Sequence, residues 1–139
     1  MVSSAPNSLK SFHFRLDPRS GVPVYRQLID QVKAGIASGK LTTGDQLPTV
    51  RQLAVDLTIN PNTVLRAYRE LELGGLLETQ QGTGTFITEK KVRHDQAERS
   101  RQLSQIVGEV LARAGAAGFT AQELLQALQE IAPETPKRS

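Results

Sequence analysis

A chain of 139 residues has the size of one domain with room for a small appendage, and it is too short for two large domains. It contains no cysteine, which excludes disulfides, thiolate metal sites and cysteine nucleophiles. The formal net charge is only +3, but residues 1–94 hold 12 Lys and Arg against 8 Asp and Glu, whereas residues 95–139 hold 5 against 6. This distribution favours an anionic partner for the first part, although an ordinary solvated surface also gives such an imbalance.

Residues 1–13 are mostly polar and show no hydrophobic period, so we expect a flexible N-terminus there. No hydrophobic segment of the signal-peptide kind is present in it. Elsewhere, no apolar run approaches the roughly 20 residues that are needed to span a bilayer. We therefore expect a soluble, cytoplasmic protein that does not contact a membrane.

The first predicted helix covers residues 24–38. Pro23 suits the first turn of a helix, and Gly39 suits its end. Its apolar residues recur at spacings of three and four, as on one face of a helix: Tyr25, Leu28, Ile29, Val32 and Ile36. The next segment, residues 40–46, is predicted to be a turn. Two leucines are expected to anchor this turn in the core: Leu41 and Leu47.

Two short helices are predicted to follow. Thr49 stands three residues before Gln52, which is the spacing of a capping box, at the start of a helix of about two turns. Asn60 as N-cap and Pro61 at the first helical position begin a second helix, which Gly74 ends. The expected buried residues are Val50, Leu53, Ala54 and Leu57 in the first, and Val64, Ala67, Tyr68 and Leu71 in the second. This arrangement matches a helix-turn-helix, although an ordinary helical hairpin shares much of the pattern.

A β-hairpin is predicted directly after the second of these helices. Residues 76–79 and 85–88 are strand-like, and the connection between them contains two glycines that permit a tight turn. A hairpin that follows a recognition-type helix is a wing. Residues 14–90 are therefore predicted to form a winged helix-turn-helix domain, and the fold class is α+β, mostly α.

The C-terminal part is predicted to form two helices in residues 91–133, which follow a basic hinge and precede a disordered tail in residues 134–139. Thr120 and Glu123 form a second capping box. The two helices carry a large aliphatic surface: Leu103, Ile106, Val107, Val110, Leu111, Leu124, Leu125 and Leu128. Because so small a pair cannot hide this surface by itself, it must pack either on the first domain or on a second copy of the chain, and we favour a homodimer.

The sequence of residues 22–87 resembles the winged-helix DNA-binding domain of the GntR family of bacterial transcription regulators. The strings LPTVRQLA, from Leu47, and NPNTVLRAYRELE, from Asn60, are similar to the YtrA subfamily, whose members end in a short two-helix dimerisation tail. Related regulators fused to an aminotransferase-like domain share the Asn-Pro-Asn-Thr helix, but this chain is too short to include that domain and its pyridoxal phosphate. We therefore expect no cofactor and no metal. The resemblance also implies a repressor that controls a transporter operon.

The predicted base-reading residues are Asn62, Thr63 and Arg66, which share the side of their helix opposite the expected buried face. The resemblance places Arg51 where the family's arginine meets the DNA backbone or a guanine, and a guanidinium suits either partner. Thr49 either contacts a phosphate or serves only as a helix cap.

Further DNA contacts are predicted next to this set. Arg69 lies one turn beyond Arg66 and either meets a phosphate or pairs with Glu70 or Glu72. The predicted wing tip would approach the adjacent minor groove or the backbone through Gln80, Gln81, Gly82 and Thr83.

These features predict a sequence-specific DNA-binding transcription regulator that binds a palindromic operator as a dimer. A small-molecule effector would have to bind at the dimer interface or between the domain and the tail. The alternative is a winged-helix module for protein contact, which the apolar Leu65 on the second helix would suit. An enzyme is not expected, because His13 and His94 lie in segments expected to be flexible and no serine stands in a nucleophile motif.

Overall fold

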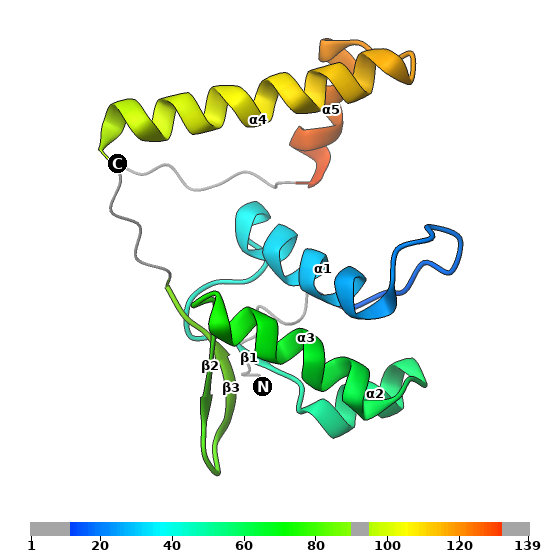
Figure 1. Ribbon diagram of the computed structural model, residues 1–139, viewed down its shortest axis with the longest axis vertical. Helices are drawn as coiled ribbons and strands as arrows, with labels where there is room; N and C mark the ends of the chain where they lie inside the picture. Colours follow the sequence, from blue (N-terminus) through cyan, green and yellow to red (C-terminus); the bar gives the residue numbers. More distant parts are fainter. Residues whose placement is uncertain (1–11, 90–94, 132–139) are drawn as a thin grey trace, which may run out of the picture. The chain divides into compact units, whose positions relative to one another are not determined.

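The computed structural model describes residues 12–89 and 95–131 of the chain. The chain divides into two compact units, Met1–Lys90 and Lys91–Ser139 (Figure 1). Most of the predicted flexible N-terminus, the basic hinge after Glu89 and the predicted disordered tail lie outside the described residues. The described elements confirm the predicted fold class, because five helices accompany one small three-stranded sheet.

Helix α1 spans Val24–Ser38, as the sequence predicts. Pro23 precedes it, and Gly39 ends it in the left-handed conformation, with a φ of 86° and a hydrogen bond of 3.2 Å from its N–H to the carbonyl oxygen of Ile36. Only glycine adopts this conformation at little cost, which explains why the helix stops there. The buried face of α1 consists of Leu28, Ile29, Val32 and Gly35.

Helices α2 (Val50–Leu57) and α3 (Pro61–Leu73) form the predicted helix-turn-helix pair. The Thr49 hydroxyl oxygen accepts a hydrogen bond of 3.0 Å from the backbone N–H of Gln52, so Thr49 caps α2. The side chain of Asn60 caps α3 by accepting 2.7 Å from the N–H of Asn62. The residues expected to be buried are buried or, for two of them, partly buried against the core: Leu53, Ala54, Val64, Ala67, Tyr68 and Leu71, with Val50 and Leu57 partly buried.

The sheet contains β1 (Gln46–Leu47), β2 (Leu77–Gln80) and β3 (Gly84–Ile87), in the spatial order β1-β3-β2 and antiparallel throughout. Strands β2 and β3 form the predicted hairpin, with Thr79 opposite Thr85. Strand β1 was not predicted, since the sequence indicated only a turn up to residue 46. Two residues are too few to show the alternation by which a strand is identified in a sequence.

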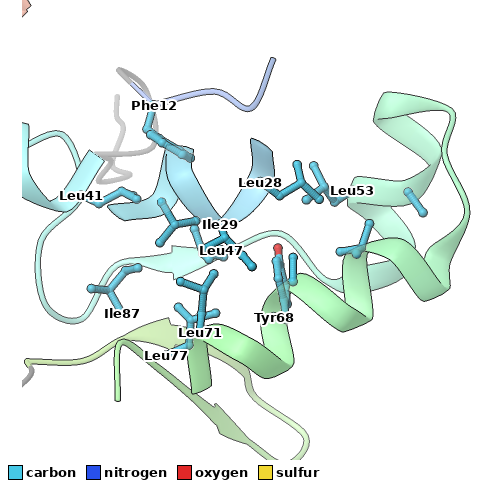
Figure 2. Close-up of a cluster of buried hydrophobic side chains, with 14 residues drawn as sticks. Phe12, Leu28, Ile29, Leu41, Leu47, Leu53, Tyr68, Leu71, Leu77 and Ile87 are labelled. Carbon is cyan, nitrogen blue, oxygen red and sulfur yellow. The ribbon is translucent and has the colours of Figure 1, made fainter. Parts of the chain in front are cut away.

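The three helices of the first unit and its sheet enclose one hydrophobic core (Figure 2). Leu41 and Leu47 lie in it, as predicted, and are 1% and 2% exposed. Tyr68 extends from α3 into the same cluster, and its hydroxyl donates a hydrogen bond of 2.7 Å to the carbonyl oxygen of Pro48. Burial raises the pKa of Tyr68 above its ordinary value.

Phe12 differs from the sequence prediction, which placed it in the flexible N-terminus. It is 8% exposed, belongs to the core and packs edge-to-face on Phe14, with ring centroids 5.0 Å apart. Gln31 of α1 holds the segment that follows, because it accepts 2.8 Å from the N–H of Arg15 and donates 2.6 Å to the Arg15 carbonyl oxygen. Phe12, Phe14 and Leu16 alternate with polar residues, a short period-2 pattern that the prediction of a flexible N-terminus did not use.

The second unit contains α4 (Gln96–Ala116) and α5 (Ala121–Ile131). Asp95 caps α4 by accepting 2.8 Å from the N–H of Glu98. The predicted capping box of α5 is confirmed, since Thr120 and Glu123 accept hydrogen bonds from each other's backbone N–H groups at 3.1 and 2.9 Å. Among the helices that the structure describes, none is long and apolar enough to cross a membrane.

Candidate nucleic-acid interface

The N-terminal end of α3 presents a polar surface to solvent. Asn60 and Pro61 determine where the helix begins, because one caps it and the other needs no hydrogen bond for its missing N–H. Asn62 in the next position is exposed, and Thr63 is half-buried. The core residues of α3 lie on the opposite side of the helix, so its solvent side is free to meet a partner.

The Arg66 side chain lies where the sequence reasoning expected it, on the exposed side of α3, but it has an unexpected neighbour. Its guanidinium carbon lies 3.6 Å from the centroid of the Tyr25 ring, in the first turn of α1. Tyr25 was predicted only as part of the apolar face of α1. No local pattern links residues 41 positions apart, so this contact could not be found from the sequence.

Arg51 and Arg69 are exposed on α2 and α3. The sequence left open whether Arg69 pairs with Glu70 or Glu72. Neither pair forms, since the one ion pair within residues 12–89 and 95–131 joins Arg101 to Glu98 at 3.1 Å, on α4. The charge of Arg69 is thus available to an external anion.

The wing tip is exposed and has a defined turn. The N–H of Thr83 donates 2.9 Å to the carbonyl oxygen of Gln80, and Gly82 between them has a φ of 78°. Figure 1 shows the hairpin projecting away from the three helices of its unit. The backbone groups and polar side chains at the tip can therefore approach a groove or a phosphate without obstruction.

Gln46 supports the wing from β1, a role that the sequence did not indicate. Its side-chain amide donates 3.1 Å to the carbonyl oxygen of Thr83. Gly84 has a φ of 140°, and a side chain at that position would collide with the Gln46 amide. The glycine thus provides both the backbone conformation and the space that this support requires.

Thr49 has a structural role whether or not it meets DNA, because its oxygen caps α2. Leu65, the apolar residue that would suit protein contact, is 36% exposed on α3. It lies beside polar neighbours rather than within an apolar patch, as Asn62, Arg66 and Arg69 are all exposed. From Asn62 to Arg69 the solvent side of α3 is therefore mainly polar and basic, whereas Leu73 at the end of the helix is 89% exposed. A polar and basic surface suits nucleic acid better than an apolar partner.

The predicted dimerisation residues lie on α4 and α5. None of the residues in these two helices is buried within the second unit, and Leu103 is 63% exposed. Seven of the predicted dimerisation residues are exposed, namely Leu103, Ile106, Val107, Val110, Leu111, Leu125 and Leu128, and Leu124 is half-buried. Where α4 meets α5, a groove of about 430 Å³ is lined mainly by apolar residues and by Arg113 and Glu123.

Comparison with known proteins gives consistent results. The model of the bacterial regulatory proteins of the gntR family matches residues 24–87. The HTH-type transcriptional repressor YtrA of Bacillus subtilis (strain 168) is 36% identical over 120 residues, which cover 86% of this chain and 92% of that protein. Among solved structures, YtrA from Sulfolobus acidocaldarius, a GntR-family transcription factor, is similar with a TM-score of 0.54 and 31% identity over 71% of this chain and 97% of its own. A transcriptional regulator from Oenococcus oeni is similar with a TM-score of 0.53 and 34% identity, over 85% of this chain and 98% of its own.

Proposed function

Because this chain belongs to the GntR family of bacterial regulatory proteins, we propose that it is a repressor that binds a palindromic DNA operator as a homodimer. Membership in this family makes it a DNA-binding transcription regulator with a winged helix-turn-helix, and the resemblance to the YtrA subfamily is confirmed. The family is one of regulators rather than enzymes, and we propose that the chain has no catalytic activity of its own. Its place of action would be the cytoplasm, where bacterial DNA lies.

The polar solvent side of α3 is the observation that carries this proposal. A helix with exposed Asn62 and Arg66 and a buried opposite face can enter the major groove while the core holds it rigid. An asparagine amide pairs with adenine through two hydrogen bonds, and a guanidinium pairs in the same way with the O6 and N7 atoms of guanine. Asn62, Thr63 and Arg66 would thus read bases.

Phosphate contacts would orient the domain on the duplex. Arg69 lies one turn beyond Arg66 and has no carboxylate partner among the described residues, so a phosphate can accept its hydrogen bonds. Thr49 and Arg51 at the start of α2 would meet the backbone or, for the arginine, a guanine. The wing tip would reach the adjacent minor groove or backbone through Gln80, Gln81, Gly82 and Thr83.

A homodimer accounts for the apolar face of α4 and α5. Burying about four leucine-sized side chains is worth on the order of 6 to 12 kcal/mol before entropy costs. Leaving these side chains exposed to water is therefore unfavourable. The interface would consist of Leu103, Ile106, Val107, Val110, Leu111, Leu124, Leu125 and Leu128. Two copies would place their α3 helices in major grooves about one helical turn, roughly 34–36 Å, apart.

Repression is supported by the name of the Bacillus subtilis relative, a transcriptional repressor that covers most of this chain. The resemblance to the YtrA subfamily further implies that the regulated genes encode a transporter. A small-molecule effector would bind at the dimer interface, where the groove between α4 and α5 offers apolar walls together with Arg113 and Glu123.

Selection from a random-sequence duplex pool tests this proposal. The wild-type protein should enrich a palindromic sequence, and gel shifts with that duplex should show retention that falls steeply as salt increases. Arg66→Ala should reduce the preference for the selected duplex over random DNA by about 10- to 100-fold, the range of one bidentate base contact. Lys33→Ala is the matched control, because Lys33 is an exposed cation on α1 outside the proposed interface.

A protein-contact module would give a different result in the same experiment. It would enrich no sequence, and any weak retention would be equal for selected and random duplexes. Arg66→Ala would then behave like Lys33→Ala. That outcome would contradict DNA recognition by α3. It would favour instead the protein-contact module that the exposed Leu65 suits.

A further inference from the structure

Tyr25 and Arg66 belong to different helices and meet at the edge of the polar surface of α3. Tyr25 is half-buried in the first turn of α1 and packs against the hydrophobic core, so its ring has little freedom. The Arg66 guanidinium carbon lies over that ring, 3.6 Å from its centroid. At this distance the guanidinium is in van der Waals contact with the aromatic face and within the range of a cation–π interaction.

The carboxylate that would ordinarily hold Arg66 is not used. Glu70 follows Arg66 by four residues on α3, a spacing at which arginine and glutamate often pair. No such pair forms among the described residues. The side chain instead extends to α1, where an uncharged ring supports it and leaves its positive charge unneutralised.

Stacking has a specific consequence for hydrogen bonding. The five N–H donors of a guanidinium lie in its plane, so an aromatic ring against one face leaves all of them available. A free arginine side chain samples many rotamers and loses that freedom when it binds a base. Support by the ring removes part of this cost in advance, because the donor plane is already oriented.

We propose that Tyr25 is a positioning residue that holds Arg66 in the conformation in which it donates to the O6 and N7 atoms of a guanine in the operator. This inference rests on the proposed function, since it needs α3 to lie in the major groove. It assigns to α1 a role in sequence preference, although α1 itself does not enter the groove. The guanidinium carbon of Arg26 is 5.6 Å from the same ring. We do not assign this base-reading role to Arg26, because it lies beside Tyr25 on α1 and not on α3.

The test uses the full chain and three probes: the most enriched duplex from the random pool, the same duplex with each guanine replaced in turn by 7-deazaguanine, and a random-sequence duplex. Arg66→Ala should weaken binding to the selected duplex by about 10- to 100-fold, the range of one bidentate base contact. Tyr25→Leu should weaken it by about 2- to 5-fold, the range of an exposed cation–π contact. Neither variant should change binding to random DNA by as much.

Two further variants distinguish positioning from a purely structural role. Tyr25→Phe retains the ring and should bind the selected duplex like wild type. The double variant Tyr25→Leu/Arg66→Ala should bind no more weakly than Arg66→Ala alone, because the tyrosine acts only through the arginine. One 7-deazaguanine substitution should weaken the wild type and Tyr25→Phe but leave Arg66→Ala unaffected.

The outcomes separate this inference from the function on which it rests. If the wild type fails to prefer the selected duplex over random DNA, both are wrong. If Arg66→Ala retains the full preference, this inference is overturned together with the base-reading role proposed for Arg66. If the wild type shows the preference but the effects of Tyr25→Leu and Arg66→Ala are additive, only this inference is overturned. The same holds if Tyr25→Phe is as weak as Tyr25→Leu.

A measurement on the wild-type protein covers the case in which Tyr25→Leu does not fold. The NMR order parameter of the Arg66 Nε–H group in the free protein should be near that of rigid backbone, about 0.85, whereas the exposed Arg51 should lie below about 0.6. Equal and low values for the two arginines would overturn the positioning role.

Discussion

The hydroxyl group of Tyr68 donates a hydrogen bond of 2.7 Å to the carbonyl oxygen of Pro48, and this bond ties the middle of α3 to the residue before the cap of α2. The two helices of the helix-turn-helix are therefore connected by a partly buried polar contact as well as by apolar packing. Because the Tyr68 side chain is buried and its hydroxyl has this one partner among the described residues, losing the hydrogen bond should lower the free energy of unfolding.

Tyr68→Phe should lower the free energy of unfolding by about 1 kcal/mol, since it removes this hydrogen bond and leaves the Pro48 carbonyl without its partner. It should also change the pH dependence. Burial raises the pKa of Tyr68 in the folded state above the ordinary value of 10.0, so the folded state keeps its proton where the unfolded state loses it. Wild-type stability should therefore decline above pH 10 by more than that of Tyr68→Phe.

Urea unfolding of both proteins between pH 8 and about 11 measures this difference. Groups other than Tyr68 titrate equally in the two proteins, so the difference between the curves isolates the tyrosine. Parallel curves over this range would show that Tyr68 is not protected from ionisation in the folded state.

Gly84→Ala should destabilise the wing. The residue has a φ of 140°, where a Cβ is strained by on the order of 1–3 kcal/mol, and the new methyl group would collide with the Gln46 side chain. Gln46→Ala removes the collision but not the backbone strain, so the double variant should be more stable than the sum of the single effects predicts. Thermal unfolding of the four proteins checks this, and strict additivity would contradict a contact between the two positions.

Two helical glycines form a matched pair for a packing test. A Cβ at Gly35 of α1 would lie 2.9 Å from side-chain atoms of both Leu41 and Phe12, whereas one at Gly108 of α4 would meet nothing within 4 Å. Gly35→Ala should thus cost about 1–3 kcal/mol through overpacking. Gly108→Ala should stabilise its helix by about 0.5–1 kcal/mol, because alanine loses less conformational freedom than glycine.

Urea titrations of the two variants give the comparison. A stabilising Gly35→Ala would mean that the Phe12 ring is not held against α1, and it would restore the sequence-based expectation of a flexible segment there. The pair also tests whether the two units unfold together, because Gly35 lies in the first unit and Gly108 in the second. If they do, both substitutions should shift the same unfolding transition.

The sequence predicted well what neighbouring residues determine. The end of α1 at Gly39 and the caps at Thr49 and Asn60 depend on side chains within one turn of the helix end, so they are visible as short patterns. Helix periodicity identified the core residues of the two HTH helices for the same reason, because burial repeats along each helix.

The features that were missed are contacts between residues far apart in the chain. Phe12 reaches the core only because α1 and the turn after it provide a pocket, and Gln46 meets Thr83 only after β1 and β3 pair. The contact of Tyr25 with Arg66 likewise depends on the packing of α1 against α3. Such contacts follow from the tertiary fold. The residues of the candidate site could therefore be predicted from the sequence, but the neighbouring side chains that orient them could not.

Ile106→Glu should separate the proposed dimer into single chains, because a carboxylate on the apolar face of α4 would be buried without a partner at the interface. Ala112→Glu is the control, since Ala112 is exposed on the opposite side of the same helix. Light scattering should give the mass of two chains for the wild type and the control, and of one chain for Ile106→Glu. A single-chain mass for all three proteins would contradict dimerisation.

Arg69→Ala should reduce the salt dependence of DNA binding without changing the preferred sequence. A phosphate contact releases condensed counterions, so removing one should lower the slope of log K against log salt concentration by about 0.9. The preference for the selected over a random duplex should persist, because phosphates carry no sequence information. Lys33→Ala should retain the wild-type slope, as Lys33 is exposed on α1. Equal slopes for Arg69→Ala and wild type would remove Arg69 from the interface, and a lost preference would instead place it among the base-reading residues.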